Sequence, residues 1–510
     1  MNFAKIIIVD YGSQYTLLIA KQIRKLNVYT EIIMPDELEK YIETINKNLY
    51  GIILSGSPKS VDDKEINKQF WEYLIENTPI PILGICYGAQ LLGFVHNMKI
   101  ENSITREFGN TLLQLTNKND PLYKDISDSH EVWMSHSDSI IIDQTINSNL
   151  EVLSRTKNGV VASFRNKTGM IYGVQFHPEV THTQIGIKLF DNFLKICKIP
   201  REWSMDNYIT DTIKNLTDKI GKDDKVLVAC SGGVDSTVTA VLIQKAIGKN
   251  MRGVFINNGL LRKNEYENVL QAYENMKLNV IGIDSSSVFY NRLKGIIEPE
   301  QKRKIIGITF IDMFKRHSPE MKWLGQGTIY SDVIESKGNI KSHHNVGGLP
   351  KDLNLELVEP LRFLFKDEVR ELGLKLGIDP IILNRHPFPG PGLGIRILGE
   401  VTKEKVLLTQ EADDIFTKKL KEHNLYDQIW QAGVILLNSL SVGVQGDCRT
   451  YEAVVALRAV TSINGMTANV AVLSTEFLTE VSTEIINKVK GINRVVYDIT
   501  TKPPGTIEWE

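Results

Sequence analysis

A cysteine with a glycine two positions away on each side is the first candidate reactive group. The segment Gly84-Ile85-Cys86-Tyr87-Gly88 follows an apolar run and precedes a helical pattern. Small flanking residues permit the sharp strand-to-helix turn that presents a nucleophile. A thiol at a helix N-terminus is also biased toward the reactive thiolate. The pattern therefore predicts that Cys86 is a nucleophile.

A nucleophilic cysteine needs a base and a group that orients the base, and the segment QFHPE contains both. His177 would shuttle the proton, and Glu179, two residues further on, would fix the imidazole tautomer. The backbone N–H of Tyr87 and one from the loop that contains Gly56 and Ser57 would form an oxyanion hole. We therefore predict nucleophilic catalysis at this cysteine.

A second candidate site is the string SGGVDST, which lies between an apolar β-branched run and a helical pattern. The glycines let the backbone turn tightly, and the helix N-terminus directs N–H groups and positive dipole toward an anion. The lysine of the GxxxxGK[ST] phosphate loop is absent. An ordinary strand-to-helix turn is the alternative. The predicted anion-binding residues are Ser231, Gly232, Gly233, Val234, Asp235, Ser236 and Thr237.

This string resembles the PP-loop of N-type ATP pyrophosphatases, which cleave ATP between its α and β phosphates. The resemblance implies ATP binding and adenylation of a second substrate. Asp235 would help to place Mg²⁺ on the pyrophosphate oxygens, because developing charge must be neutralised there. The metal follows from this chemistry and not from ligand spacing.

Length and composition limit the possible classes of protein. A chain of 510 residues is too long for one core and suggests roughly three domains. Its net charge of −2 gives no general attraction to nucleic acid or anionic membranes. The four cysteines form no CxxC pair, and we find neither a signal-peptide core nor an apolar run long enough to span a membrane. We expect a cytoplasmic protein with reduced thiols.

Short apolar runs alternate with helical patterns in two successive series. The first includes KIIIVD, YGIILSGSP and IPILGICYG, and the second begins with KVLVACSGG and continues through RGVFINNGLL and NVIGIDSS. Such alternation predicts α/β domains with a mixed, mainly parallel sheet first and a parallel sheet second. The last part predicts a small α+β module. We place the domains at 1–197, 198–385 and 386–510.

The first 195 or so residues resemble a class I glutamine amidotransferase in three places: the Cys86 segment, QFHPE and SGSP. The resemblance implies that Cys86 forms a glutamyl thioester, that ammonia leaves, and that water releases glutamate. Gln90, Ser137 and Asp138 match family positions that hold the glutamine head group.

Two positions depart from the usual pattern of that family, because SGGP and SHGD read SGSP and SHSD here. If Ser57 or Ser137 required positive φ, the serine would cost stability or demand rearrangement. We therefore hypothesise that the oxyanion hole is unformed until the other domain binds its substrate.

Over its whole length, the chain resembles glutamine-hydrolysing GMP synthases. The matching strings include EPEQKRKIIG, KSHHNVGGLP, HPFPGPGLGIR, VGVQGDCR and KPPGTIEWE. The resemblance implies that ATP adenylates XMP at O2 and that ammonia from glutamine displaces AMP. The products would be GMP, AMP, pyrophosphate and glutamate. It also implies a homodimer formed through the C-terminal module.

That resemblance assigns XMP-binding roles to four residues. Arg303 and Lys502 would supply cations, and Gln445 and Glu508 would hydrogen-bond the base or ribose. A solvated tail is the alternative for Lys502 and Glu508, because terminal residues are commonly exposed.

Two loops complete the predicted nucleotide site. HPFPGPGLG is too rich in proline and glycine for a helix or central strand, so we expect free N–H groups at Gly390, Gly392 and Gly394 to bind phosphate. A hinge is the alternative. The polar KSHHNVGGLP segment suits a mobile lid, and its Lys341, His343 and His344 are the candidate lid residues.

Two further functions remain open at this point. The chain could be another PP-loop amidotransferase that acts on a different acid or base, or a catalytically impaired nucleotide-binding scaffold. The first would lack KPPGTIEWE and VGVQGDCR, and the second would lack Cys86, His177 or an intact SGGVDS. The chain contains both sets.

Overall fold

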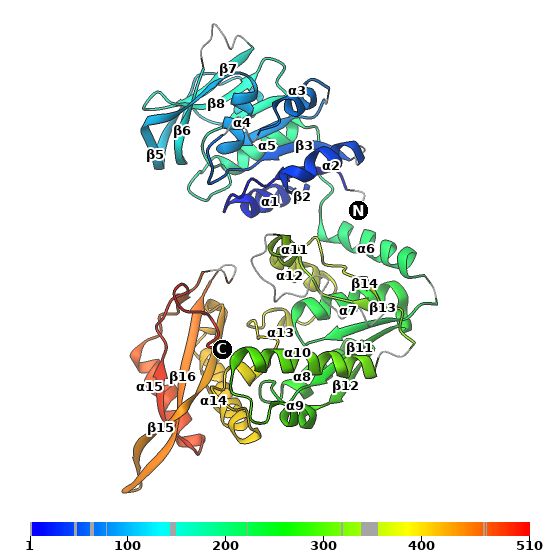
Figure 1. Cartoon of the computed structure of the whole chain (residues 1–510), viewed down its shortest axis with the longest axis vertical. Coiled ribbons are helices and arrows are strands. Elements are labelled where there is room, and N and C mark those ends of the chain that lie inside the picture. The colour runs from blue at the N-terminus through cyan, green and yellow to red at the C-terminus, as the bar shows by residue number, and fades with distance from the viewer. Residues whose placement is uncertain are drawn as a thin grey trace. The chain divides into compact units, whose positions relative to one another are not determined.

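The computed structural model divides into two compact units, Met1–Tyr208 and Ile209–Glu510. In Figure 1, unit 1 runs from blue through cyan to blue-green, and unit 2 runs from green to red. The predicted boundary at residue 385 lies inside unit 2 and stays a prediction. The structure describes residues 3–44, 48–61, 66–77, 79–142, 149–221, 223–317, 320–337, 355–462, 465 and 467–510.

A nine-stranded mixed sheet forms the centre of unit 1, in the order β2-β1-β3-β4-β9-β8-β7-β5-β6. The first five strands in this order pair in parallel, and the others pair antiparallel. Strands β1, β4 and β9 are buried throughout, as continuous apolar runs predict. The mixed sheet is therefore confirmed. Its strands are β1 (Lys5–Val9), β2 (Tyr29–Ile33), β3 (Leu49–Leu54), β4 (Ile82–Ile85), β5 (Lys99–Leu115), β6 (Ser129–Ile141), β7 (Leu150–Thr156), β8 (Val161–Asn166) and β9 (Ile171–Val174).

Amphipathic helices pack against this sheet. In α1 the buried side chains include Ile19, Ala20 and Ile23, which recur at helical spacing. The helix that begins at Tyr87 is almost entirely buried. The helices of this part are α1 (Thr16–Lys25), α2 (Leu38–Thr44), α3 (Lys68–Asn77), α4 (Tyr87–Val95) and α5 (Gly186–Ile196), with 3₁₀ turns η1 (Pro35–Glu37) and η2 (Pro121–Tyr123). Helix α6 (Met205–Ile220) crosses the division between the units.

A parallel five-stranded sheet lies in unit 2, in the order β12-β11-β10-β13-β14. Strands β11 and β12 lie on one side of β10 and strands β13 and β14 on the other, so the strand order reverses at β10. Ligands of such sheets bind at the carboxyl ends of the strands beside this reversal. The string SGGVDST begins directly after β10. The strands are β10 (Val226–Cys230), β11 (Met251–Asn257), β12 (Val280–Asp284), β13 (Trp323–Gly325) and β14 (Glu356–Val358).

The last part of unit 2 is the predicted α+β module. A long antiparallel ribbon of β15 (Gln431–Gln445) and β16 (Cys448–Thr461) carries the short β17 (Asn469–Val470) and the parallel β18 (Ile492–Tyr497). Helices α14 (Lys403–Glu422) and α15 (Thr475–Lys488) pack together beside this sheet (Figure 1). One hydrophobic core joins this module to the parallel-sheet part of unit 2.

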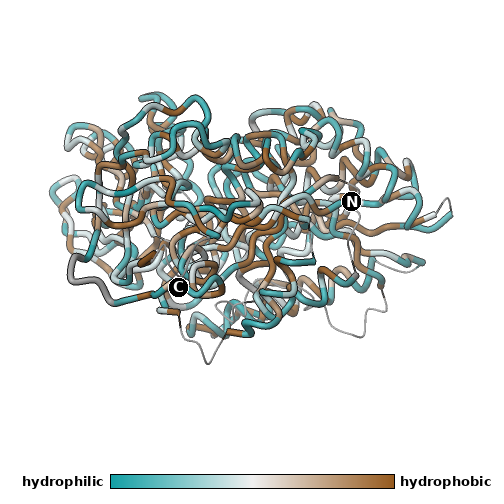
Figure 2. The backbone as a smooth tube through the Cα atoms, turned by 90° about the horizontal axis from the view of Figure 1, so that it is seen from above, coloured by the Kyte–Doolittle hydropathy of each residue, from teal (hydrophilic) through white to brown (hydrophobic). Residues whose placement is uncertain are grey.

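The remaining helices of unit 2 surround the parallel sheet. Figure 2 shows hydrophobic and hydrophilic residues interleaved along the described backbone. Within that part of the chain, no helix combines the length and apolar character needed to cross a membrane. The helices are α7 (Val234–Ile247), α8 (Glu265–Asn275), α9 (Ser286–Leu293), α10 (Pro299–Arg316), α11 (Tyr330–Lys337), α12 (Lys366–Lys375) and α13 (Pro380–Leu383), with 3₁₀ turns η3 (Gly248–Asn250), η5 (Gly392–Ile395) and η6 (Tyr426–Gln428).

Candidate active sites

Cys86 occupies a strained turn between β4 and α4. Its φ of +52° is unfavourable for a residue with a side chain. Gly84 and Gly88 permit the turn, because a Cβ on Gly84 would lie 2.4 Å from the backbone of Gly88, and one on Gly88 would lie 2.5 Å from the Leu54 carbonyl oxygen. The Cys86 N–H donates to the Val174 carbonyl at 2.8 Å, which anchors the turn.

His177 and Glu179 follow β9 and lie beside this cysteine. The imidazole hydrogen-bonds with Cys86, and Nδ1 is 2.7 Å from Oε1 of Glu179. His177 is 4% exposed and Glu179 1% exposed, so solvent does not screen the pair. The Thr183 hydroxyl donates to the His177 carbonyl at 2.7 Å and fixes the segment. The geometry is that of a nucleophile, a base and an orienting carboxylate.

The charge of Glu179 sets the protonation of His177. Burial alone would lower the pKa of the imidazole. The carboxylate charge and hydrogen bonds with Cys86 and Glu179 outweigh burial and raise the pKa to about 10. The imidazole is therefore protonated at neutral pH and can stabilise negative charge on the adjacent sulfur.

A cavity of about 430 Å³ opens onto the sulfur. Gln90 Nε2 lies 3.0 Å from the Asp138 carbonyl oxygen, which links α4 to the predicted glutamine-binding segment of β6. Gly56 lies next to the imidazole, and a Cβ there would be 3.3 Å from Cε1 of His177. The predicted residues that line the cavity are Ser57, Cys86, Tyr87, Gln90, Ser137, Asp138 and His177.

The two serines at usual glycine positions carry no backbone strain. Neither Ser57 nor Ser137 has a positive φ, so the premise of an unformed oxyanion hole is wrong. Ser57 instead stabilises its own turn, since its Oγ accepts the Lys59 N–H at 3.1 Å. The strain lies at Cys86 itself.

In unit 2, hydrogen bonds among its own residues shape the loop after β10. The Ser231 N–H donates to Ser236 Oγ at 3.2 Å, and Ser236 Oγ donates to the Gly233 carbonyl at 3.1 Å. Thr237 is fully buried and donates to the same carbonyl at 2.8 Å. Gly232 has a φ of +74°, which requires glycine. The hydroxyls of Ser236 and Thr237 therefore stabilise the loop through hydrogen bonds with its backbone.

A cavity of about 720 Å³ lies in front of this loop, within the usual size range of small-molecule sites. Phe310 and Phe314 of α10 contribute an apolar wall suited to an aromatic base. The predicted residues that line the cavity are Ser231, Gly233, Val234, Asp235, Arg303, Gly390 and Gly392. The structure thus brings the PP-loop, Arg303 and the proline-glycine loop to one cavity.

Asp235, the predicted magnesium ligand, is paired with a lysine. Both of its carboxylate oxygens lie 2.6 Å from Nζ of Lys366. Among the described residues, no group of three or more His, Cys, Asp or Glu side chains could hold a metal ion. A single carboxylate together with ATP phosphates is a normal environment for Mg²⁺. Asp235 fits the ion only with the nucleotide present.

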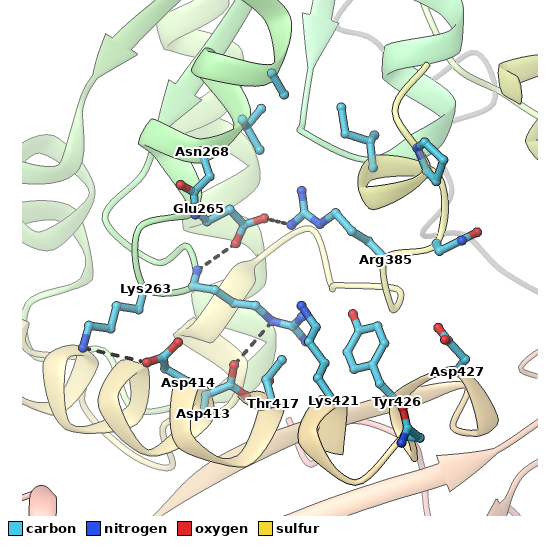
Figure 3. A pocket seen from close by; sticks show the side chains of 17 residues that line it. Lys263, Glu265, Asn268, Arg385, Asp413, Asp414, Thr417, Lys421, Tyr426 and Asp427 are labelled. Atoms are coloured by element: carbon cyan, nitrogen blue, oxygen red, sulfur yellow. Dashed lines mark hydrogen bonds and ion pairs between the residues drawn. The ribbon is translucent and has the colours of Figure 1, made fainter. Parts of the chain in front are cut away.

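Arg385 fixes the backbone of the PP-loop at Gly232. Its Nη1 donates to the Gly232 carbonyl at 2.9 Å, and its Nη2 pairs with Glu265. Glu265 is held in turn by the Arg262 N–H at 2.8 Å. Figure 3 shows the Arg385–Glu265 pair at the edge of a neighbouring cavity of about 550 Å³. A fixed Gly232 carbonyl also fixes the orientation of the Gly233 N–H, because both belong to one peptide plane.

Comparisons with known proteins identify the family. Family models of class I glutamine amidotransferases, NAD synthase and the GMP synthase C-terminal domain match residues 7–197, 205–306 and 418–509. Proteins named GMP synthase [glutamine-hydrolyzing] from Cytophaga hutchinsonii and Porphyromonas gingivalis are 53% and 52% identical to this chain, each over 99% of both chains. The chain belongs to the glutamine-hydrolysing GMP synthase family. It is a glutamine-dependent carbon–nitrogen ligase.

The proline-glycine loop of this family member differs from our expectation. The Gly392 N–H donates to the Pro389 carbonyl at 2.9 Å, and the Gly394 N–H donates to the Pro391 carbonyl at 3.3 Å. The loop continues into the 3₁₀ turn η5, which uses these donors. The expectation of free N–H groups is wrong for both glycines. Phosphate binding at Gly390 stays a prediction.

The C-terminal residues assigned to XMP are not among the residues that line the large cavity. Glu508 accepts two hydrogen bonds from Arg396, each 2.9 Å long, so a solvated tail is wrong for this residue. Lys502 Nζ donates to the Gly465 carbonyl at 2.7 Å. Gln445 is exposed at the end of β15. Their roles in binding XMP stay predictions.

The predicted lid residues Lys341, His343 and His344 lie outside the described residues. Sequence reasoning missed Gln175, whose Nε2 is 3.7 Å from Cys86 Sγ. It also missed the basic residues Lys366 and Arg385, which line the cavity in front of the PP-loop, called the nucleotide cavity below. Gln175 lies two residues before the base in QFHPE, and its position on that segment could have suggested it.

Proposed function

We propose that this chain converts XMP to GMP with ATP and glutamine as co-substrates. ATP would adenylate O2 of XMP, and ammonia would then displace AMP. The observation that carries the proposal is the Cys86–His177–Glu179 arrangement, in a chain whose other unit has a PP-loop cavity. Full-length similarity to GMP synthases supports the choice of XMP.

In unit 1, Cys86 would attack the glutamine carboxamide carbon, and protonated His177 would donate its proton to the departing ammonia. Glu179 would keep the imidazole oriented throughout. Gln90 and the segment that contains Ser137 and Asp138 would bind the amino acid end of glutamine. Tyr87, Gly56 and Ser57 stay the candidate backbone donors to the oxyanion.

In unit 2, the amides at the start of α7 would bind ATP phosphate, aided by the helix dipole. Arg303 would contact the phosphate of XMP, and the phenylalanine wall of α10 would cover a purine. Mg²⁺ bound with ATP would offset charge on the pyrophosphate as it leaves. Asp235 would hold the ion, and Lys366, released from Asp235, would bind a phosphate instead.

One assay tests this function. Loss of XMP is followed by absorbance with ATP and Mg²⁺, with either glutamine or ammonium as nitrogen donor. We expect Cys86→Ala to lose glutamine-dependent turnover and to keep ammonium-dependent turnover. Retained glutamine activity would overturn the assignment of Cys86. Absence of XMP turnover in the wild type would overturn the substrate.

We infer a homodimer through the β15–β16 ribbon. The apolar side chains of Leu440, Val442 and Val444 alternate along β15 and are 71%, 48% and 75% exposed, and Tyr451 is opposite Val442 on β16. An apolar face of this kind commonly marks an interface. Light scattering should give twice the chain mass, and Leu440→Asp with Val444→Asp should give one chain mass.

We also infer a cytoplasmic location. All four cysteines are free thiols, and three of them are buried. Free thiols accord with a reducing compartment. Microscopy of a fluorescent fusion with compartment markers tests this inference.

A further inference from the structure

A buried carboxylate–imidazole pair lies beside the cavity that opens onto Cys86. Glu107 on β5 and His136 on β6 are opposite each other in the antiparallel ladder. Their side chains are 2% and 1% exposed. Thr156 Oγ1 and Asn158 Nδ2 each donate to Oε1 of Glu107 at 2.9 Å. Burial of such a pair is costly, so its geometry needs a reason.

The two remaining polar atoms of the pair face each other. Oε2 of Glu107 and Nε2 of His136 are 3.6 Å apart, and within the described chain neither has a hydrogen-bond partner. On the other side of the ring, Nδ1 lies 2.9 Å from the Asp138 carbonyl oxygen. A carbonyl only accepts, so Nδ1 must carry a hydrogen. At 3.6 Å, Oε2 and Nε2 are within ion-pair range but just outside hydrogen-bond range.

Burial raises the pKa of Glu107, but the neighbouring His136 and hydrogen bonds from Asn158 and Thr156 outweigh burial and lower it. The lowered pKa keeps Glu107 an anion, and its Oε2 faces Nε2 of His136 at 3.6 Å. The ring contacts the Asp138 carbonyl on one side and the Glu107 carboxylate on the other, so it cannot rotate without losing a buried polar contact.

The Asp138 carbonyl oxygen is the point at which two parts of the glutamine site meet. It faces His136 Nδ1 at 2.9 Å and accepts Gln90 Nε2 at 3.0 Å. Gln90 also contacts Gln175 at 3.4 Å, and the Gln175 amide lies 3.7 Å from Cys86 Sγ. A chain of hydrogen bonds therefore runs from the buried pair to the nucleophile.

We propose that Glu107 is a positioning residue for glutamine, which acts through His136 to hold the Asp138 carbonyl and the adjoining segment of β6. The proposal rests on the glutaminase function proposed above. His136 and Asp138 line the cavity, whereas Glu107 lies behind it. Loss of Glu107 should therefore raise the KM for glutamine and spare the ATP-dependent half of the reaction.

Two substitutions test the contact. Leucine in Glu107→Leu has a similar volume but offers Nε2 no acceptor. The amide in Glu107→Gln can still donate to Nε2 of a neutral imidazole. We expect Glu107→Leu to raise the KM for glutamine about tenfold, equivalent to about 1.4 kcal/mol, with kcat nearly unchanged. The KM of Glu107→Gln for glutamine should stay within about threefold of the wild-type value. Ammonium-dependent synthesis by both variants should equal that of the wild type.

Alkylation of Cys86 separates binding from reactivity. A glutamine analogue with a diazoketone in place of the amide must bind before it alkylates the sulfur, whereas iodoacetamide need not. We expect Glu107→Leu to weaken saturable binding of the diazoketone about tenfold and to leave the iodoacetamide rate unchanged. Equal losses with both reagents would overturn the positioning role.

Asp120→Asn is the matched control. Asp120 is an equally buried carboxylate of unit 1, and it pairs with Arg165 at 3.0 Å. This substitution should lower the melting temperature and leave the KM for glutamine unchanged. If Glu107→Leu does not fold, Glu107→Asp, which retracts the carboxylate by one methylene, should show the same rise in KM.

A double-mutant cycle tests whether the effect passes through the imidazole. If Glu107 acts only through His136, Glu107→Leu adds nothing to His136→Leu. Additive effects would overturn this path, and an unchanged KM in folded Glu107 variants would overturn the proposal. Failure of the wild type to hydrolyse glutamine would instead overturn the function on which the proposal rests.

Discussion

The carboxylate of Asp235 is bound through both oxygens, at 2.6 Å each, by Nζ of Lys366. Asp235 lies in the first turn of α7, and Lys366 is the first residue of α12. Both side chains line the nucleotide cavity and are partly exposed, at 29% and 40%. The lysine offsets a negative charge that would otherwise repel triphosphate from the helix N-terminus.

This pair predicts the phenotype of Asp235→Ala. ATP phosphates should take Lys366 from Asp235 and leave the carboxylate available to Mg²⁺. Without the carboxylate, we expect kcat for GMP formation to fall by about 100-fold or more, with glutamine and with ammonium alike. Pyrophosphate release, measured with ammonium as donor, reports this directly.

The matched control for that variant is Asp224→Asn. Asp224 also pairs with a lysine in unit 2, because its Oδ2 accepts Nζ of Lys322 at 2.8 Å. That pair does not line the nucleotide cavity. An equal loss of activity in both variants would show that general destabilisation, and not the position of Asp235, causes the defect.

Arg385 gives a second prediction for the PP-loop. The variant Arg385→Met loses the hydrogen bond to the Gly232 carbonyl and the pair with Glu265. We expect the KM for ATP to rise about tenfold, because the Gly233 N–H loses its fixed orientation. Steady-state kinetics with ammonium measure the change.

Lys421→Met is the control for Arg385→Met, since Lys421 lines the neighbouring cavity and contacts the Tyr426 ring. Equal KM values for these two variants would contradict the prediction.

The two reactive loops were predictable because their chemistry is local. In each, a strand, a small-residue turn and a helix are consecutive in the chain, so spacing alone places Cys86 and Asp235 at helix starts. The order of apolar runs likewise predicted the parallel sheet of unit 2. The antiparallel half of the first sheet has longer strands with alternating burial, and its extent was harder to foresee.

The supporting contacts were not predictable, because they join residues far apart in sequence. Lys366 is 131 residues from Asp235, and Arg385 is 153 residues from Gly232. No motif connects such positions. The error at Gly392 has another cause, since composition excludes a long helix but does not exclude a single 3₁₀ turn that uses the amides.

The elevated pKa of His177 predicts a pH-dependent stability of unit 1. The folded-state pKa is about 10, whereas an unfolded histidine titrates near about 6.5. Between these values the folded state binds more protons, so this stabilisation is complete below about 6.5 and is lost as pH rises toward 10. The slope from one group is at most about 1.4 kcal/mol per pH unit.

The variant Glu179→Gln isolates this contribution. Without the carboxylate charge, burial should lower the pKa of His177, and the loss of stability between pH 6.5 and 10 should become smaller. Melting temperatures of both proteins across this range measure the difference. Parallel curves would contradict the assignment of the proton to His177.

Two glycines of α4 differ in what surrounds them. A Cβ at Gly88 would lie 2.5 Å from the Leu54 carbonyl oxygen in β3, whereas a Cβ at Gly93 would meet Sδ of Met98 at 3.1 Å. A central strand cannot yield without losing sheet hydrogen bonds, but a methionine side chain can move. We expect Gly88→Ala to destabilise unit 1 by about 3 kcal/mol and to abolish glutamine-dependent synthesis. The free energy of unfolding of Gly93→Ala should stay within about 1 kcal/mol of the wild-type value. Denaturant unfolding measures this quantity for both variants, and equal losses would contradict this account of the turn.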